Sequence, residues 1–197
     1  MNFLAHLSLS GDDPDIMIGN FIADHVRRVE WEQFNTRIIA GIELHHKIDF
    51  FTDNHAIVEA SKERLRPYHG KYSGVVSDIL YDHFLSANYI EFHPGKPVEK
   101  FANEVYGLLN NRFEELPAGT QYMLPYMEKH NWLVAYGERE GLQQVFNGMH
   151  RRASFENDMH HSVDHLYENY EDYKAEFYAF YPLLQDFVNS QINSLKA

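Results

Sequence analysis

Two pairs of possible metal ligands occur in this chain at the same spacing. His45 and Asp49 are four residues apart, and Asp78 and Asp82 repeat that interval. Residues four apart on a helix share one face, so each pair would present two side chains in a line. Imidazole nitrogen combined with carboxylate oxygen suits Mn²⁺, Fe²⁺, Zn²⁺ or Mg²⁺. A carboxylate-rich site with open coordination positions predicts hydrolysis of a phosphodiester.

Other possible ligands gather in the first half of the chain, where they follow apolar residues. Asp24, Asp49 and Asp82 each come directly after such a segment, whereas His150, His160, His161 and His165 lie among charged residues that look exposed. A carboxylate on the core-facing side of a helix is expensive to desolvate unless it is paired or bound to a cation. One metal ion would stabilise several of these groups at once. Buried salt bridges to arginine or lysine side chains are the alternative explanation.

Helical periodicity supplies the elements that would position these side chains. Apolar residues recur at helical spacing in four long segments, at residues 34–51, 55–65, 73–89 and 162–180. Pro67 is expected to end the second of these, and Pro182 to separate the fourth from a last helix. No strand pattern competes with the helical one. The sequence therefore predicts one all-α domain over residues 1–197, a bundle of about eight to ten helices.

Composition narrows the class of protein further. The chain has no cysteine, which excludes disulfides and thiolate metal sites. Its net charge of −12 disfavours binding to the phosphate backbone of nucleic acid. The N-terminal residues lack the basic start of a signal peptide, and no apolar run approaches the roughly 18–20 residues of a membrane span. We therefore expect a cytoplasmic protein that binds neither nucleic acid nor membrane.

Five polar motifs occur in a set order along the first half of the chain. They are Asn2-Phe-Leu-Ala-His6, Gly19-Asn-Phe-Ile-Ala-Asp24, Gly41-Ile-Glu-Leu-His45 with Asp49, Thr52-Asp-Asn54 and Asp82-His-Phe-Leu85. Together they resemble the acyl carrier protein phosphodiesterases. The resemblance continues through Asn147-Gly-Met149 and Arg151-Arg152 to Phe180-Tyr-Pro182, and so it covers nearly the whole chain.

The resemblance implies a reaction, a cofactor and a place in lipid metabolism. Family enzymes hydrolyse the phosphodiester that joins 4′-phosphopantetheine to a serine of holo acyl carrier protein, and they depend on Mn²⁺ or another divalent metal. They are divergent relatives of the all-helical HD phosphohydrolases. This chain departs from the HD signature, because no histidine directly precedes an aspartate and Asp82-His83 has the reverse order. The ligand set of HD enzymes therefore cannot be carried over by motif.

Roles can be assigned to the residues with this reaction in view. His6, Asp24, Asp82 and His83 are the expected catalytic residues, with His6 either a ligand or the acid that protonates the leaving serine oxygen. Asn20 is expected to bind the phosphate or a ligand, and Asp53 to be a ligand or to orient a histidine. The expected metal ligands are Asp24, His45, Asp49, Asp53, Asp82 and His83.

An acidic carrier protein would be repelled by a chain of this net charge unless a basic rim surrounds the site. The candidates for such a substrate-binding rim are Arg27, Arg28, Lys47, Arg151 and Arg152. Two other functions remain open: a metal-dependent phosphohydrolase for a nucleotide or another small phosphodiester, and a non-catalytic helical interaction module. The glycine-rich phosphate loops of nucleotide enzymes are absent from the sequence.

Overall fold

Capping side chains fix where the helices of the first half begin. In the computed structural model, which describes residues 1–195, Asn35 accepts hydrogen bonds from the amides of Arg37 and Ile38 and starts the helix that carries His45. Asp13 caps the preceding helix in the same way, with Pro14 in its first position. The α-helices are α1 (Phe3–Ser8), α2 (Pro14–Ile22), α3 (Thr36–Asp53), α4 (Ala56–His69), α5 (Ser73–Ala87), α6 (Tyr89–Phe92), α7 (Val98–Asn111), α8 (Ala118–Lys129), α9 (Trp132–Ala135), α10 (Arg139–Arg152), α11 (Ser162–Glu168) and α12 (Tyr170–Ser194).

Short 3₁₀ helices connect several of these elements. They are η1 (Ala23–His25), η2 (Arg28–Gln33), η3 (Gly70–Tyr72), η4 (Phe113–Glu115) and η5 (Met159–His161). The described residues contain no strand, so the all-α prediction is confirmed. None of the helices in residues 1–195 has both the length and the apolar character needed to cross a bilayer.

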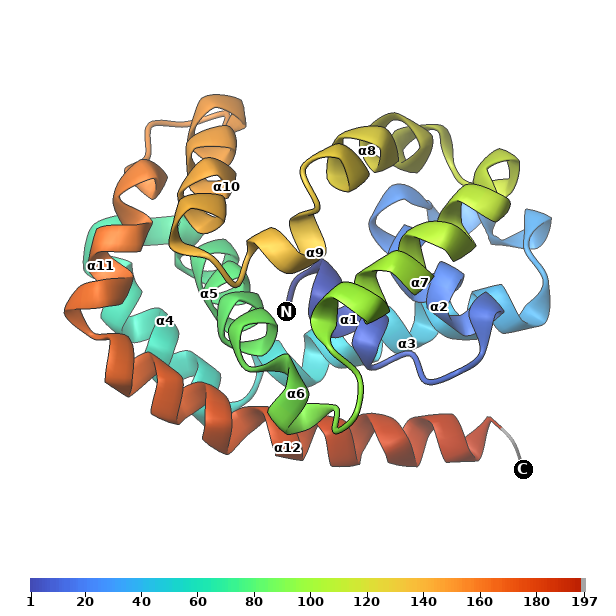
Figure 1. The fold of residues 1–197 in the computed structure, drawn as a ribbon, viewed down its shortest axis with the longest axis horizontal. Coiled ribbons are helices and arrows are strands. Elements are labelled where there is room, and N and C mark those ends of the chain that lie inside the picture. Colours follow the sequence, from blue (N-terminus) through green and yellow to red (C-terminus); the bar gives the residue numbers. More distant parts are fainter. Residues whose placement is uncertain (196–197) are drawn as a thin grey trace.

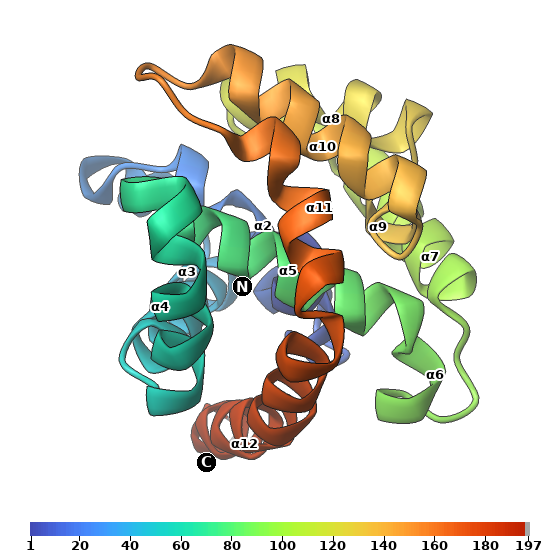
Figure 2. The same ribbon diagram turned by 90° about the vertical axis from the view of Figure 1, so that its left-hand side faces the viewer.

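The short helix α1 lies in the middle of the molecule, as both views show (Figures 1 and 2). Helices α2 and α5 pack against it, and α12 runs along the bottom in Figure 1, where it packs against α3, α4 and α5. The buried apolar side chains of these helices form one continuous core. Because α1 is enclosed, the side chains that it presents to α3 are held from several directions.

Helices α2 and α3 make the most extensive contact in the fold, and two glycines allow it. A Cβ atom on Gly19 would lie 2.0 Å from the carbonyl oxygen of Ile38, and one on Gly41 would lie 2.2 Å from that of Ile16. The two backbones therefore approach more closely than any side chain would permit. This crossing brings Asn20 of α2 against His45 of α3.

Two helix ends differ from the prediction, and both involve proline. Pro67 lies inside α4 and Pro182 inside α12, so neither residue ends a helix. A proline in a helix interior costs roughly 3 kcal/mol through the lost hydrogen bond and the clash with the preceding turn. Around Pro182, the complete burial of Phe180, Tyr181 and Leu184 offsets that cost. The expected number of helices was also too low, because the short helices α1, α6 and α9 leave little periodic signal.

Candidate metal centre

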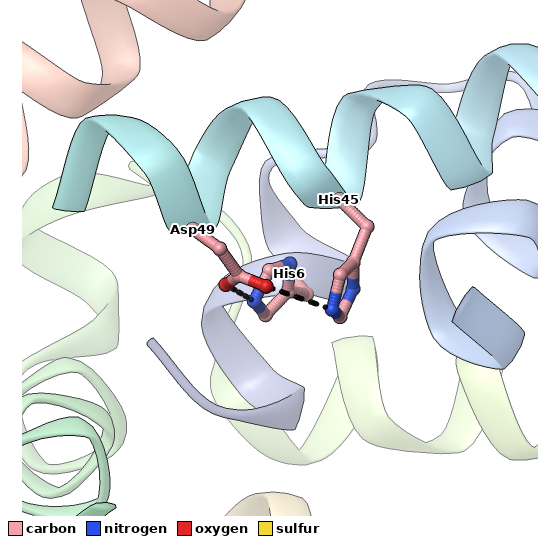
Figure 3. A group of neighbouring side chains, drawn as sticks. All are labelled: His6, His45 and Asp49. Carbon is pink, nitrogen blue, oxygen red and sulfur yellow. Dashed lines mark ion pairs between the residues drawn. The ribbon is translucent and has the colours of Figure 1, made fainter. Parts of the chain in front are cut away.

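Three side chains from α1 and α3 meet at one point (Figure 3). Asp49 lies between two imidazoles: its Oδ1 is 3.1 Å from His6 Nε2, and its Oδ2 is 3.1 Å from His45 Nε2. The two rings stack with their centroids 4.0 Å apart. Their possible ligand atoms all lie within 4.8 Å of one another, and within residues 1–195 no other such group of three or more histidine or acidic side chains forms.

Asn20 fixes the orientation of both imidazoles. His6 Nδ1 donates to Asn20 Oδ1 at 2.9 Å, and His45 Nδ1 donates to the Asn20 carbonyl oxygen at 2.8 Å. Since these oxygens can only accept, both rings carry their proton on Nδ1 and turn Nε2 toward Asp49. Metal-binding histidines are commonly held in this way by a partner on the other nitrogen. The imidazoles are therefore oriented for a cation without further movement.

Asn20 was expected to hydrogen-bond either the phosphate or a metal ligand, and its contacts in the structure are with the two candidate ligands, His6 and His45. Its side chain is fully buried, and its amide group donates to the His6 carbonyl oxygen at 2.8 Å and to Ser10 Oγ at 3.0 Å. With its oxygen bonded to an imidazole as well, Asn20 has no group left for phosphate. The residue holds the histidines in place.

The charges of the group are set by its burial and by its internal hydrogen bonds. Burial lowers the pKa of His6 to about 4, although the negative charge of the Asp49 carboxylate beside it opposes this shift. Burial also acts to lower the pKa of His45, but its hydrogen bonds with Asp24 and Asp49 outweigh that effect and raise the pKa to about 9. Burial works to raise the pKa of Asp49, and the two histidines hold it well below its usual range. Near neutral pH His6 is thus neutral and Asp49 ionised, and His45 alone carries a second ring proton, on Nε2.

The three side chains line a cavity of about 240 Å³ with an acidic wall. Asp24, whose side chain is 69% exposed, has Oδ1 3.3 Å from His45 Nε2. Asp53 and Asp78 line the same cavity. Nitrogen and carboxylate oxygen are the donors that Mn²⁺ and Zn²⁺ accept, and the exposed side of Asp24 and Asp49 leaves room for further ligands. The donor set therefore fits a divalent cation with open positions.

Asp82 and His83, which were expected to be metal ligands and catalytic residues, do not join this group. Asp82 is completely buried, and its carboxylate accepts hydrogen bonds from the amides of Asn2 and Leu4 at 3.0 and 2.8 Å, which caps the start of α1. His83 is also buried, and its Nδ1 donates to the Tyr136 carbonyl oxygen at 2.8 Å. Neither side chain lines the cavity.

A substitution of Asp82 separates a structural role from a ligand role. We expect Asp82→Ala to lower the free energy of unfolding by about 1–3 kcal/mol, because it leaves buried amides of α1 without an acceptor. Asp82→Asn keeps an acceptor oxygen and should lose less. Denaturant unfolding measures both, and calorimetry should find Mn²⁺ binding by the folded variants close to that of the wild type. Normal stability combined with loss of Mn²⁺ binding would instead identify Asp82 as a ligand.

The residues expected to form a basic rim differ in their surroundings. Arg27 is paired with Glu30 at 2.9 Å, whereas the guanidinium of Arg28 lies 3.8 Å from the ring centroid of Trp31. Trp31 stacks in turn on His46, the neighbour of His45. The remaining members, Lys47, Arg151 and Arg152, are exposed and form no ion pair within residues 1–195.

Two contacts beside the centre escape detection in the sequence. Trp31 stacks on the exposed ring of His46, and Lys62 donates to Asp53 with its ammonium group. Neither residue belongs to a recognisable motif, and both contacts depend on how η2 and α4 pack on α3.

The chain is similar to known proteins over nearly its whole length. The family model described as acyl carrier protein phosphodiesterase matches residues 1–184. The curated relatives named acyl carrier protein phosphodiesterase include one from Photorhabdus laumondii, 28% identical, which covers 94% of both chains. A relative of that name from Enterobacter sp. (strain 638) is 31% identical over 92% of this chain and 94% of its own. One from Escherichia coli is 30% identical over 94% and 96%, respectively. No solved structure matches the chain.

Proposed function

Since the chain belongs to the acyl carrier protein phosphodiesterase family, we propose that it removes 4′-phosphopantetheine from holo acyl carrier protein with a divalent cation bound by His6, His45 and Asp49. The observation that supports the site most strongly is the pair of Nε2 atoms turned onto one carboxylate in an open acidic cavity. Two histidines held by one buried asparagine in this way are difficult to explain by packing alone.

The roles of the protein groups follow from their charge and exposure. A bound divalent cation supplies a Lewis acid for the phosphoryl oxygens. His6 has no proton on Nε2 near neutral pH, so it acts as a ligand and not as the acid for the leaving serine. The hydrogen bond with His45 lowers the pKa of Asp24, which is therefore ionised, exposed and able to accept a proton from the attacking water. Water adds to phosphorus and gives its proton to Asp24, the bond from phosphorus to the serine oxygen breaks, and that oxygen takes up a proton from solvent to become the serine hydroxyl.

Mass spectrometry of the carrier protein tests the reaction class. Holo acyl carrier protein incubated with this protein and Mn²⁺ is expected to lose the mass of phosphopantetheine and become apo acyl carrier protein. The same sample with a chelator should remain unchanged. Hydrolysis of small phosphodiesters with no effect on the carrier protein would favour the general phosphohydrolase instead.

Metal binding should release one proton below about pH 9. The pKa of His45 is raised to about 9, so at pH 7 its imidazole is protonated and a cation must displace that proton. His6, with a pKa of about 4, has none to release. Affinity for Mn²⁺ should therefore rise roughly tenfold per pH unit between pH 6 and 8, and flatten above about pH 9. Calorimetry in buffers of different ionisation enthalpy measures the number of protons released per Mn²⁺ bound. A value of zero at pH 7 would contradict the prediction that His45 is protonated in the metal-free protein.

Recognition of an acidic carrier protein requires a positively charged side chain that is not already paired with a carboxylate of the enzyme. Arg28 meets this requirement better than Arg27, because its guanidinium rests on Trp31 while Arg27 is occupied by Glu30. Stacking on an aromatic ring fixes the guanidinium and leaves its N–H groups free for a carboxylate. Arg28 also stands next to the centre through the contact of Trp31 with His46.

Adjacent arginines thus provide a matched pair of variants. Arg28→Ala is expected to raise KM for holo acyl carrier protein roughly tenfold with little change in kcat, because it removes an attractive charge from the binding surface. Arg27→Ala should change KM much less. Steady-state kinetics at low and high salt measures both effects, and the contribution of Arg28 should shrink as salt rises. Equal effects of the two substitutions on KM would contradict the proposal that Arg28, and not Arg27, binds the carrier protein.

A further inference from the structure

Lys62 is a buried lysine whose ammonium group is bonded to a carboxylate that lines the metal cavity. Its side chain is 11% exposed, and Nζ donates to Asp53 Oδ1 at 2.7 Å. The carboxylate of Asp53 is 62% exposed and lines the cavity with the metal group. Lysine is rarely buried without a charged partner, because desolvating the ammonium group is costly. The pair joins α4 to Asp53, the last residue of α3, which lines the cavity, so loss of either partner would change the charge of the cavity wall.

The charges around the cavity show what Lys62 contributes. A divalent cation held by His6 and His45 would be balanced by the carboxylates of Asp24 and Asp49. Asp78 is already paired with the ammonium group of Met1 at 2.8 Å. Asp53 is the remaining carboxylate on the wall, and Lys62 neutralises it. Without Lys62 the loaded site would carry a net negative charge and repel a phosphodiester anion.

We infer that Lys62 is a positioning residue for the anionic substrate, acting through Asp53. By holding the Asp53 carboxylate, it keeps that group away from the cation and makes the cavity wall neutral toward phosphate. The sequence-based expectation for Asp53 was a metal ligand or a group that orients a histidine; its hydrogen-bond partner is Lys62. This inference rests on the proposed function.

A purely structural role for the pair makes different predictions. Arg64, two residues further along α4, forms a two-pronged ion pair with Glu176 of α12, at 2.8 Å for both contacts and away from the cavity-lining residues. Arg64→Met is therefore the control for loss of a tether on the same helix. It should lower stability and leave the affinity for Mn²⁺ and KM unchanged.

The test measures Mn²⁺ affinity by calorimetry and KM for holo acyl carrier protein in three variants. Lys62→Met should bind Mn²⁺ roughly fivefold more tightly, since a nearby cation is lost, and should have a KM roughly fivefold higher. Asp53→Asn should shift both quantities in the opposite direction. The double variant Lys62→Met with Asp53→Asn restores the neutral wall and should return both quantities close to the wild-type values.

The outcomes separate this inference from the proposed function. Wild-type protein that binds no Mn²⁺ at the histidines would overturn the proposed function itself. Two other results would overturn only the role of Lys62, provided that the wild-type protein binds Mn²⁺. One is a Lys62→Met variant with unchanged Mn²⁺ affinity and unchanged KM, and the other is a double variant whose Mn²⁺ affinity and KM do not return to the wild-type values. If Lys62→Met does not fold, Asp53→Asn still decides the matter, because its exposed side chain tolerates the change and a lower KM, which loss of a metal ligand would not give, is required of it.

Discussion

Asp49→Ala is expected to lower kcat for holo acyl carrier protein by roughly 10³-fold or more and to abolish measurable Mn²⁺ binding. Asp49 is the carboxylate that both Nε2 atoms face, at 3.1 Å in each case. Its loss would remove an anionic ligand and the charge that balances the cation, and a bound metal contributes several kcal/mol to transition-state stabilisation. The side chain is 39% exposed, so the fold should tolerate the change.

The matched control for this substitution is an aspartate outside the cavity. Asp172→Ala removes an exposed carboxylate from the first turn of α12 and should leave kcat and Mn²⁺ binding unchanged. Circular dichroism should find the same helix content in both variants. An Asp49→Ala protein that binds Mn²⁺ and retains activity would place the chemistry elsewhere.

Gly41→Ala is expected to cause a large loss of stability. The added Cβ would lie 2.2 Å from the Ile16 carbonyl oxygen and 2.9 Å from the Asn20 amide nitrogen, both backbone atoms that cannot rotate away. Helices α2 and α3 would have to separate, and overpacking of this kind costs about 3 kcal/mol or more. Because the crossing places Asn20 against His45, Mn²⁺ affinity should fall as well.

Gly107→Ala provides the comparison, since a Cβ there meets no atom within 4 Å. Gly107 lies inside α7, so alanine should be neutral or stabilise the protein by up to about 1 kcal/mol through its higher helix propensity. Denaturant unfolding of the two variants compares them directly. Equal stability of both would mean that the close approach of α2 and α3 is not required.

The sequence predicts the face of a helix more reliably than it predicts what covers that face. His45–Asp49 and Asp78–Asp82 have the same spacing and lie on helices near their expected positions, α3 and α5. One pair faces the metal cavity; in the other, Asp82 faces the first amides of α1 and caps them. Periodicity places the residues correctly, but the position of α1 decides their roles.

The contacts that complete the site join residues distant in the chain. Asn20 holds His6 and His45, and Lys62 holds Asp53, in each case across helices whose packing no local pattern encodes. The two prolines inside α4 and α12 illustrate the same limit, because tertiary burial outweighs a local helix-breaking preference. The order of the polar motifs, by contrast, was sufficient to indicate the family.

Anomalous X-ray scattering at the manganese absorption edge, measured on crystals of the protein grown with Mn²⁺, tests the central claim most directly. One anomalous peak is expected within coordination distance of His6 Nε2, His45 Nε2 and an Asp49 oxygen, and no such peak is expected in crystals of the Asp49→Ala variant. A peak bound instead by Asp82 or His83, or catalytically active crystals with no peak at the three residues, would contradict it.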